Sequence, residues 1–189
     1  MVADALKAPA MAAIRYVVKN EHDASHSSYT AFSGPPNEDN IHAWEDLIQP
    51  TFFSATEQEL VNSGVQVDNA VQLREGGYLA SLGVHHQLHC LRQFRLFLYQ
   101  ETFYPNLTQP HKRYLQGHLD HCIESIRLQV MCSGDLSLYT FTWDGVLATS
   151  NKPHARVRTH RKCVDWERLE SWSLGRKVLL HPTLIRNEE

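Results

Sequence analysis

The chain has 189 residues, of which 42% are hydrophobic and 21% charged, and its formal net charge is −3. This length fits one domain with a sizeable core, and the composition excludes a disordered chain or a coiled coil. The weak negative charge gives no basis for binding nucleic acid. The longest apolar run near the start, residues 8–18, is interrupted by Arg15 and is shorter than the roughly 20 residues that a membrane span needs. It is also a poor signal peptide. We therefore expect neither nucleic acid as a partner nor a membrane span in this chain.

The first part of the chain divides into a leader and the start of a domain. Residues 1–28 are expected to form an N-terminal leader outside the core, and residues 29–189 a single domain. Asn37 precedes two acidic residues and an apolar stripe at helical spacing, which predicts a capped helix. Thr56 begins a capping-box sequence and predicts a second, short helix that ends at Gly64.

The rest of the chain predicts a small hairpin followed by two long helices. Residues 65–73 and 78–84 flank a Glu-Gly-Gly turn and predict the hairpin. The expected elements after it are long helices over 85–103 and 113–131, a strand over 136–143, a loop over 149–158 and a final helix capped by Asp165. The predicted fold class is α+β and helix-dominated, with a central antiparallel helix pair and a small β-hairpin or sheet.

Each long helix carries one His-x-x-His-Cys motif. The motifs comprise His86, His89 and Cys90 on the first helix and His118, His121 and Cys122 on the second. Residues three and four apart on a helix share one face, so an antiparallel pair brings four imidazoles into one cleft. Two such matches are expected by chance in only about 1 in 10,000 shuffled chains. The alternative is a set of surface histidines beside cysteines that pack as small apolar residues.

The donor types indicate a transition metal and leave its identity open. Imidazole suits zinc, copper, iron and nickel, and copper binds most tightly in the divalent series. The four cysteines, Cys90, Cys122, Cys132 and Cys163, allow two disulfides or thiolate ligands. Thiolates would favour a closed zinc site or Cu(I), whereas oxidised cysteines leave an all-histidine site that favours copper. Haem-attachment, zinc-hydrolase and nucleotide-binding motifs are absent from the sequence.

At these residues the chain resembles the UstYa-like proteins of fungal secondary metabolism. Residues 77–80 leading to 86–91 resemble the first family signature, and residues 118–124 with Arg127 and 131–132 resemble the second. Residues 34–36 with Trp44, and His160, Cys163, Asp165 and Trp172, match the flanking segments. The second motif ends in Glu124 where the family usually has Asp. The resemblance covers about residues 34–175.

The resemblance implies an activity and a ligand set. It implies a copper-dependent oxidoreductase that uses O2 for oxidative cyclisation, hydroxylation, desaturation or halogenation of a small-molecule or cyclic-peptide natural product. It implies that His86, His89, His118 and His121 hold the metal, and that copper is favoured over zinc or iron. Asp120 and Glu124 are candidates to accept a ligand imidazole N–H, and His85 is expected to point away from the site.

The resemblance also bears on compartment, partners and cysteines. It implies a secretory-lumen location, although family members usually carry an N-terminal membrane helix that this chain lacks, and a homo- or hetero-oligomer with a second family member. Together with the even cysteine count and the sequon at Asn106, it favours Cys132–Cys163 and Cys90–Cys122 disulfides over free thiols. Two other functions stay open: a non-redox cyclase or isomerase that uses His86, His89 or His121 as proton carriers, and a non-catalytic pathway partner.

Overall fold

A computed structural model describes residues 7–19, 29–138, 140–142, 154–156, 160–179 and 181–185. The helices are α1 (Glu38–Ile48), α2 (Glu57–Asn62), α3 (Gly83–Leu98), α4 (Gln100–Phe103), α5 (Gln109–Ser133) and α6 (Trp166–Leu174), with 3-10 turns η1 (Pro9–Ala13) and η2 (Gln49–Thr51). The strands are β1 (Tyr16–Lys19), β2 (Phe53–Ala55), β3 (Gln72–Leu73), β4 (Tyr78–Ala80), β5 (Thr140–Thr142), β6 (His154–Arg156), β7 (Arg161–Val164) and β8 (Leu184–Ile185). The helix-dominated α+β class is confirmed.

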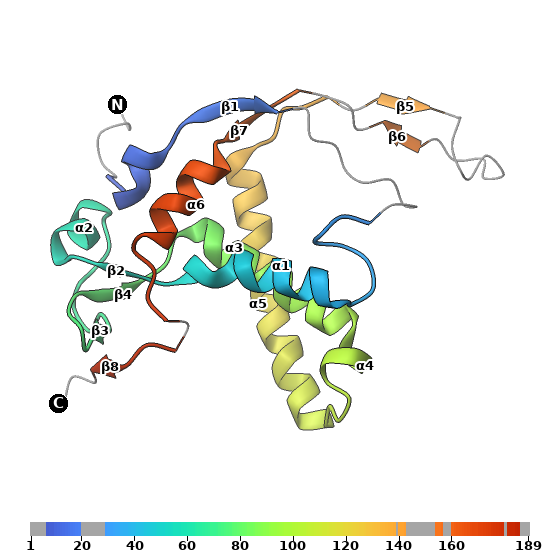
Figure 1. The fold of residues 1–189 in the computed structure, drawn as a ribbon, viewed down its shortest axis with the longest axis horizontal. Helices are drawn as coiled ribbons and strands as arrows, with labels where there is room; N and C mark the ends of the chain where they lie inside the picture. The colour runs from blue at the N-terminus through green and yellow to red at the C-terminus, as the bar shows by residue number, and fades with distance from the viewer. Residues whose placement is uncertain are drawn as a thin grey trace.

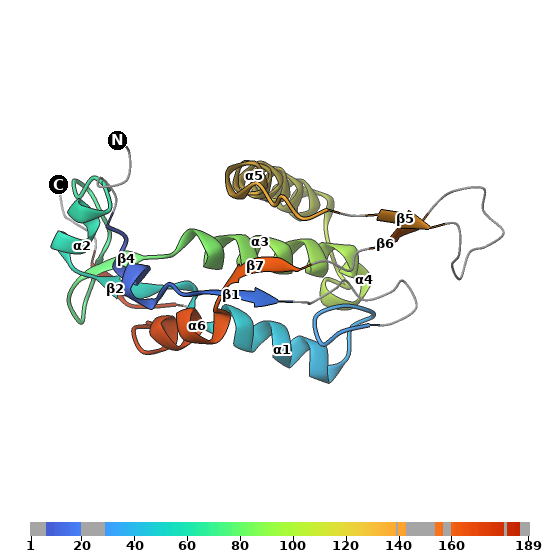
Figure 2. The ribbon, with the colours of Figure 1, turned by 90° about the horizontal axis from the view of Figure 1, so that it is seen from above.

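Helix α3 runs through the middle of the molecule. Figure 2 shows α5 on one side of α3 and α1 with α6 on the other side. In Figure 1 α5 crosses α3 steeply, and both α1 and α5 are in contact with α3. No helix in the described part of the chain is long and apolar enough to cross a membrane. Because α3 lies between these helices, its side chains contact α5 on one side and α1 and α6 on the other.

The predicted hairpin is present, with shorter strands than expected. Strands β3 and β4 are antiparallel and belong to a four-stranded sheet of order β2-β4-β3-β8. Gly77, in the turn, has φ +82°, and a Cβ there would overlap the Ser54 side chain on β2. Strand β4 is short because it pairs with β2 only from Tyr78 to Ala80, and α3 begins at Gly83.

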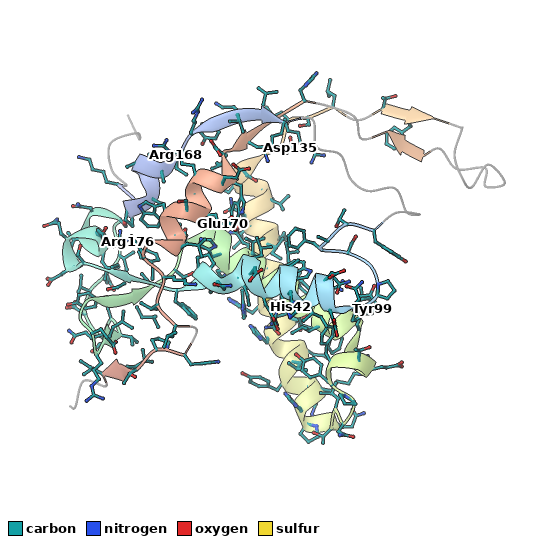
Figure 3. All side chains as sticks on the ribbon, viewed as in Figure 1. His42, Tyr99, Asp135, Arg168, Glu170 and Arg176 are labelled. Atoms are coloured by element: carbon teal, nitrogen blue, oxygen red, sulfur yellow. The ribbon has the colours of Figure 1, made fainter. Side chains whose placement is uncertain are left out.

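Helix α1 begins at the predicted cap and is tied to α3 by a buried arginine. Asn37 and Asn40 exchange capping hydrogen bonds of 2.9 and 3.1 Å. Arg95 on α3 donates to Gly34 O and to Asn40 Oδ1, both at 2.8 Å, and its guanidinium lies 5.1 Å from the centre of the Tyr99 ring. Figure 3 shows Tyr99 where α3 gives way to α4. One side chain therefore fixes the turn before α1 onto the central helix.

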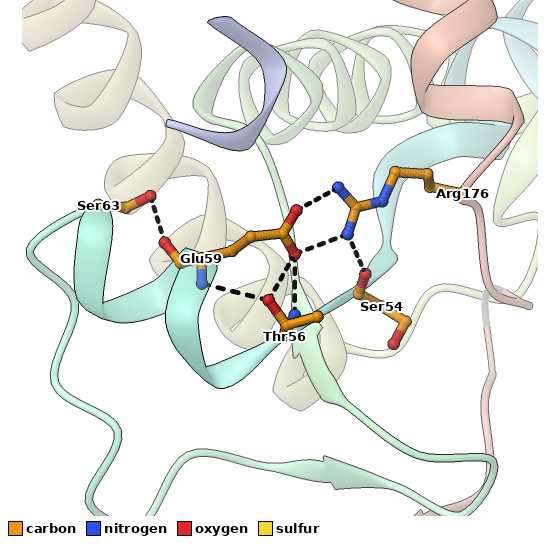
Figure 4. A network of polar contacts seen from close by, with 5 residues as sticks. All are labelled: Ser54, Thr56, Glu59, Ser63 and Arg176. Carbon is orange, nitrogen blue, oxygen red and sulfur yellow. Dashed lines mark hydrogen bonds and ion pairs between the residues drawn. The ribbon is translucent and has the colours of Figure 1, made fainter. Parts of the chain in front are cut away.

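The C-terminal segment is joined to α2 by an ion pair (Figure 4). Arg176 donates to both Glu59 carboxylate oxygens, at 2.6 and 2.7 Å, and to Ser54 O at 2.8 Å. Its guanidinium also lies over the rings of Phe53 and Trp172, 5.2 and 5.0 Å from their centres. The Glu59 carboxylate in turn accepts from Thr56 N, which completes the predicted capping box.

The prediction that residues 1–28 lie outside the core is wrong for residues 7–19. Strand β1 pairs antiparallel with β7, and Ala10 and Ala13 of η1 are buried. Arg168 on α6 donates to Ala12 O at 3.3 Å. The sequence prediction failed because the partners of this segment lie about 145 residues downstream. Residues 1–6 and 20–28 of the predicted leader lie outside the described residues.

The segment after α5 also differs from the prediction. A strand was predicted over 136–143. Among the described residues of that range, only those of β5 form a strand, and β5 pairs with β6. Strand β6 lies inside residues 149–158, for which a loop was predicted, and the rest of that range lies outside the described residues. Residues 136–138 alternate apolar and polar residues but are not in a strand. Leu136 and Leu138 are exposed.

Candidate metal centre

The two long helices have the predicted order but different ends. The first breaks at Tyr99 (φ −107°, ψ 40°) into α3 and α4. The second begins four residues earlier than expected because Thr108 caps it and Pro110 occupies the first turn. Both motifs lie inside helices, His86 to Cys90 on α3 and His118 to Cys122 on α5.

The four motif histidines form two facing pairs, one ring from each helix. The ring centroids of His86 and His121 are 5.7 Å apart, and those of His89 and His118 are 6.0 Å apart. At the contact, residue numbers therefore rise along α3 as they fall along α5, but the two helices cross steeply instead of packing as the antiparallel pair that the sequence predicts (Figure 1). His121 is exposed and the other three are half-buried, so the group borders solvent.

A serine on α5 and a cysteine on α3 flank the His86 ring. Ser125 Oγ lies 3.3 Å from His86 Nδ1, and Cys90 Sγ lies 4.0 Å from Nε2. The first distance is a hydrogen bond across the helix interface, whereas the second is a weak contact. Sequence reasoning missed Ser125, although it follows His118 by seven residues and His121 by four and so shares their face of α5.

The local environment disfavours charge on His89 and on Cys90. Burial lowers the pKa of His89, and the nearby His118, His86 and Arg92 lower it further. Burial and the hydrogen-bonded neighbour Cys122 raise the pKa of Cys90 to about 12. Cys90 and Cys122 are both 0% exposed. The site therefore disfavours the charged forms of the His89 imidazole and the Cys90 thiol.

His85 points away from the motif histidines, as its sequence position predicts. Its Nε2 lies 2.9 Å from Ser173 Oγ on α6, and Trp166 contacts its ring edge to face. Ser173 donates its proton to Leu169 O, so it accepts from His85 Nε2–H. Burial lowers the pKa of His85. His85 thus anchors α3 to α6 as a neutral ring.

The structure does not place the two predicted carboxylates on the imidazoles. Both Glu124 oxygens accept from Arg127, at 2.6 and 2.8 Å. Asp120 is exposed, and in the described part of the chain no hydrogen bond joins it to an imidazole. Their predicted role as acceptors stays a prediction. Ser125, rather than either carboxylate, lies within hydrogen-bond distance of a candidate ligand, His86.

The imidazole pairs have a spacing compatible with a shared ion. Metal–nitrogen bonds of about 2.0–2.1 Å place the centroids of two imidazoles on one ion roughly 5–6.5 Å apart, and the two observed separations fall within this range. Among the described residues, no three His, Cys, Asp or Glu side chains already form an ion-binding group. Binding by three or four of these histidines therefore requires ring rotation.

The other two cysteines lie away from this interface. Cys132 is exposed near the end of α5, and Cys163 is half-buried on β7. All four cysteines are free thiols in the structure. The disulfide pairing expected from the sequence thus stays a prediction.

An apolar hollow lies along the C-terminal half of α3. Its volume is about 510 Å³ and its lining includes Phe32, Phe94, Phe97 and Leu98, with Arg95 and Tyr99 at one side. Phe97 also faces the α3–α5 interface beside His118. The hollow is thus lined in part by the same helix that carries His86 and His89.

Comparison with known proteins connects the chain to one family. A family model described as "Mycotoxin biosynthesis protein UstYa" matches residues 2–176. The chain is 29% identical to "UstYa family oxidase phomYc" of Diaporthe leptostromiformis, over 78% of this chain and 59% of that protein. It is 31% identical to "Transacylase cctO" of Talaromyces islandicus, over 90% of this chain and 60% of that protein. The chain thus spans about three fifths of the length of these relatives. No solved structure matches it.

Proposed function

Because the chain belongs to the UstYa family of mycotoxin-biosynthesis proteins, we propose that it is an oxidoreductase of fungal secondary metabolism with a copper centre held by His86, His89, His118 and His121. The observation that carries the proposal is the pairing of these four imidazoles across α3 and α5. The name of the relative phomYc as an oxidase supports the reaction class. The substrate is proposed to be a small-molecule or cyclic-peptide natural product.

The donor set supports copper over zinc. Cys90 and Cys122 are fully buried between the helices, whereas the four imidazoles border solvent, which favours an all-imidazole set. Imidazole donors suit copper, which leads the divalent affinity series. When bound, copper supplies one-electron chemistry with O2 as oxidant.

The protein's own residues have separate roles in this proposal. The paired imidazoles would hold the ion, with His121 on the solvent-exposed side of the group. Ser125 fixes the orientation of His86 through Nδ1, so that Nε2 is the nitrogen left for the ion. The apolar hollow beside Phe97 would bind the hydrocarbon part of a substrate.

Metal analysis tests the centre directly. The purified chain should bind copper stoichiometrically, and the His86→Ala/His121→Ala double variant should lose it, as measured by plasma mass spectrometry after equilibration and desalting. His42→Ala, on the exposed face of α1 (Figure 3), is the matched control and should bind as the wild type does. Full copper occupancy in the double variant would refute the proposal.

Metabolite comparison tests the reaction class. A strain lacking the gene should accumulate a precursor that differs from the mature product by two hydrogens, one oxygen or a halogen. The wild-type gene should restore the product, and the double variant should not. A precursor and product of identical composition would instead indicate isomerisation.

A non-redox function is the second candidate. It is favoured by the lowered pKa of His89, which leaves this imidazole neutral as a proton acceptor, and by the relative cctO, which is named a transacylase. In this case product formation would survive complete removal of copper by a chelator, whereas the copper proposal requires its loss.

A further inference from the structure

The turn between α4 and α5 contains an acceptor sequence for N-linked sugar. Asn106-Leu107-Thr108 is the only Asn-x-Ser/Thr sequence in the chain, and its middle residue is not proline. Triplets of this kind are common by chance, so the position of the asparagine in the fold decides whether the sequence is usable. We infer that Asn106 is a glycosylation site, modified by an oligosaccharide on its side-chain amide.

Asn106 is accessible in the folded chain. It is exposed and occupies the third position of a turn, which Leu107 N closes by donating to Tyr104 O at 3.1 Å. Among the described residues, no hydrogen bond involves the Asn106 side chain. Figure 1 shows the start of α5 and the turn before it at the lower end of the molecule. A sugar attached at this position displaces no packed side chain.

Thr108 supplies the hydroxyl that the acceptor sequence requires. It is exposed, and its Oγ1 accepts from His111 N at 3.4 Å as the cap of α5. This bond is long, and it uses a lone pair of the oxygen and not the hydroxyl proton. The hydroxyl therefore keeps its donor capacity while it caps the helix.

The modification is a group transfer to the amide nitrogen of Asn106. The co-reactant is an oligosaccharide joined through its anomeric carbon to a polyisoprenyl diphosphate. A bond forms between Nδ2 and the anomeric carbon, and the bond from that carbon to the diphosphate oxygen breaks. Nδ2 loses one proton, and the diphosphate leaves with the bonding electron pair. Because this donor is used in the secretory lumen, glycosylation requires that the α4–α5 turn enters that lumen.

The surface beside Asn106 suits a sugar ring. The centroid of the Tyr104 ring lies 6.2 Å from that of His111, and the His111 centroid lies 6.4 Å from that of Tyr114. His111 and Tyr114 are both exposed. The negative faces of such rings attract the C–H groups on one side of a sugar. Roughly 14 Å of helix separates the start of α5 from His118, so the attachment point lies outside the imidazole group.

Mass spectrometry of protein from the native host tests the inference. The full-length protein is produced from its own gene and digested with trypsin, which places Asn106 in peptide 96–112. Treatment with peptide:N-glycosidase in heavy-oxygen water converts a glycosylated asparagine into an aspartate that carries one heavy oxygen atom. We expect this label at residue 106. We also expect peptide 96–112 to be depleted at its unmodified mass before the treatment.

Two variants and an untreated digest are the controls. Asn106→Gln should lose the label and should migrate like the deglycosylated wild type, whereas Thr108→Ser keeps both the hydroxyl and the helix cap and should keep the glycan. A wild-type peptide 96–112 found at its unmodified mass would overturn the inference, as would equal labelling without the glycosidase. Since no step involves copper, the result is independent of the copper proposal.

Discussion

Ser125 shows how a single side chain sets the properties of the candidate centre. A histidine that binds a metal through one nitrogen usually donates the N–H of the other to a neighbouring acceptor, and losing that acceptor costs about 10–100-fold in metal affinity. Ser125 Oγ is that neighbour for His86 Nδ1, at 3.3 Å.

We therefore predict that Ser125→Ala weakens copper binding by about 10–100-fold without abolishing it. A competition titration against a chromophoric chelator measures the change. Ser133→Ala is the matched control, because Ser133 is an exposed serine of the same helix that bonds only to backbone carbonyls. Equal affinities for Ser125→Ala and Ser133→Ala would show that Ser125 does not position His86.

The sequence predicts part of the site at this scale, for a physical reason. Helical spacing of three and four places His86 with His89, and His118 with His121, before any fold is known. It does not reveal that His85 bonds to Ser173, because 88 residues separate them and no local rule relates the two. It also does not reveal that Glu124 bonds to Arg127 rather than to an imidazole, since both partners are compatible with its position on the helix.

At the scale of elements, Arg95 joins the turn before α1 to α3. Arg95→Met keeps much of the packing and removes both hydrogen bonds, which leaves Gly34 O without this donor and Asn40 Oδ1 with its capping bond from Asn37 N. We predict a loss of about 2–3 kcal/mol in the free energy of unfolding, measured by urea titration. Arg113→Met, at an exposed position of α5, should change stability little. Copper stoichiometry should be unchanged in both, since neither residue contacts the imidazoles.

The Glu59–Arg176 pair makes stability depend on pH in the acid range. Hydrogen bonds from Arg176 are the main cause that lowers the pKa of Glu59 from 4.5 to about 2, with a smaller contribution from Thr56. A carboxyl with a lowered pKa in the folded state stabilises the fold fully above its unfolded pKa. That stability is lost as the pH falls from about 4.5 towards 2.

We predict that Glu59→Gln lowers the free energy of unfolding by about 1–2 kcal/mol at pH 7, after allowance for solvent screening. The difference from the wild type should shrink as the pH is lowered from 4.5 to 2.5, as urea titrations at several pH values would show. Glu57→Gln, an exposed change in the same helical turn, is the control and should cost little at pH 7. A difference for Glu59→Gln that stays constant over this pH range would contradict the assignment.

Sequence patterns predicted the elements better than their pairing. The capping residues Asn37 and Thr56 predicted where α1 and α2 begin. The turn at Gly77 predicted the hairpin. These signals are readable in the sequence because they act within a few residues. Strand β6 was not predicted because it has only three residues, which are too few to show an apolar alternation. It is defined by its pairing with β5.

At the scale of the whole molecule, the N-terminal segment belongs to the framework around the site. Ala13 is 5% exposed in η1, which contacts α6, whereas its neighbour Ala12 is exposed. Helix α6 in turn holds α3 through Ser173 and His85. The N-terminal segment is therefore connected to the motif helix through two successive contacts.

Ala13→Asp should destabilise the fold by about 3 kcal/mol or more, because it places an unpaired carboxylate in a buried position. Ala12→Asp is its matched control and should be close to neutral. Thermal unfolding of both variants measures the difference. Equal Tm values would mean that residues 7–19 are dispensable for the fold.

The pairing of β1 with β7 bears on the order in which the molecule folds. Tyr16 and Val164 are 148 residues apart, whereas His86 and His121 are separated by 35. Closing the longer loop costs about 1 kcal/mol more entropy, and long-range contacts form more slowly than local ones. Both helices also precede β7 in the chain, so they are synthesised before it. The histidine-bearing helices would therefore be the early-folding nucleus, and the N-terminal strand would join the structure last.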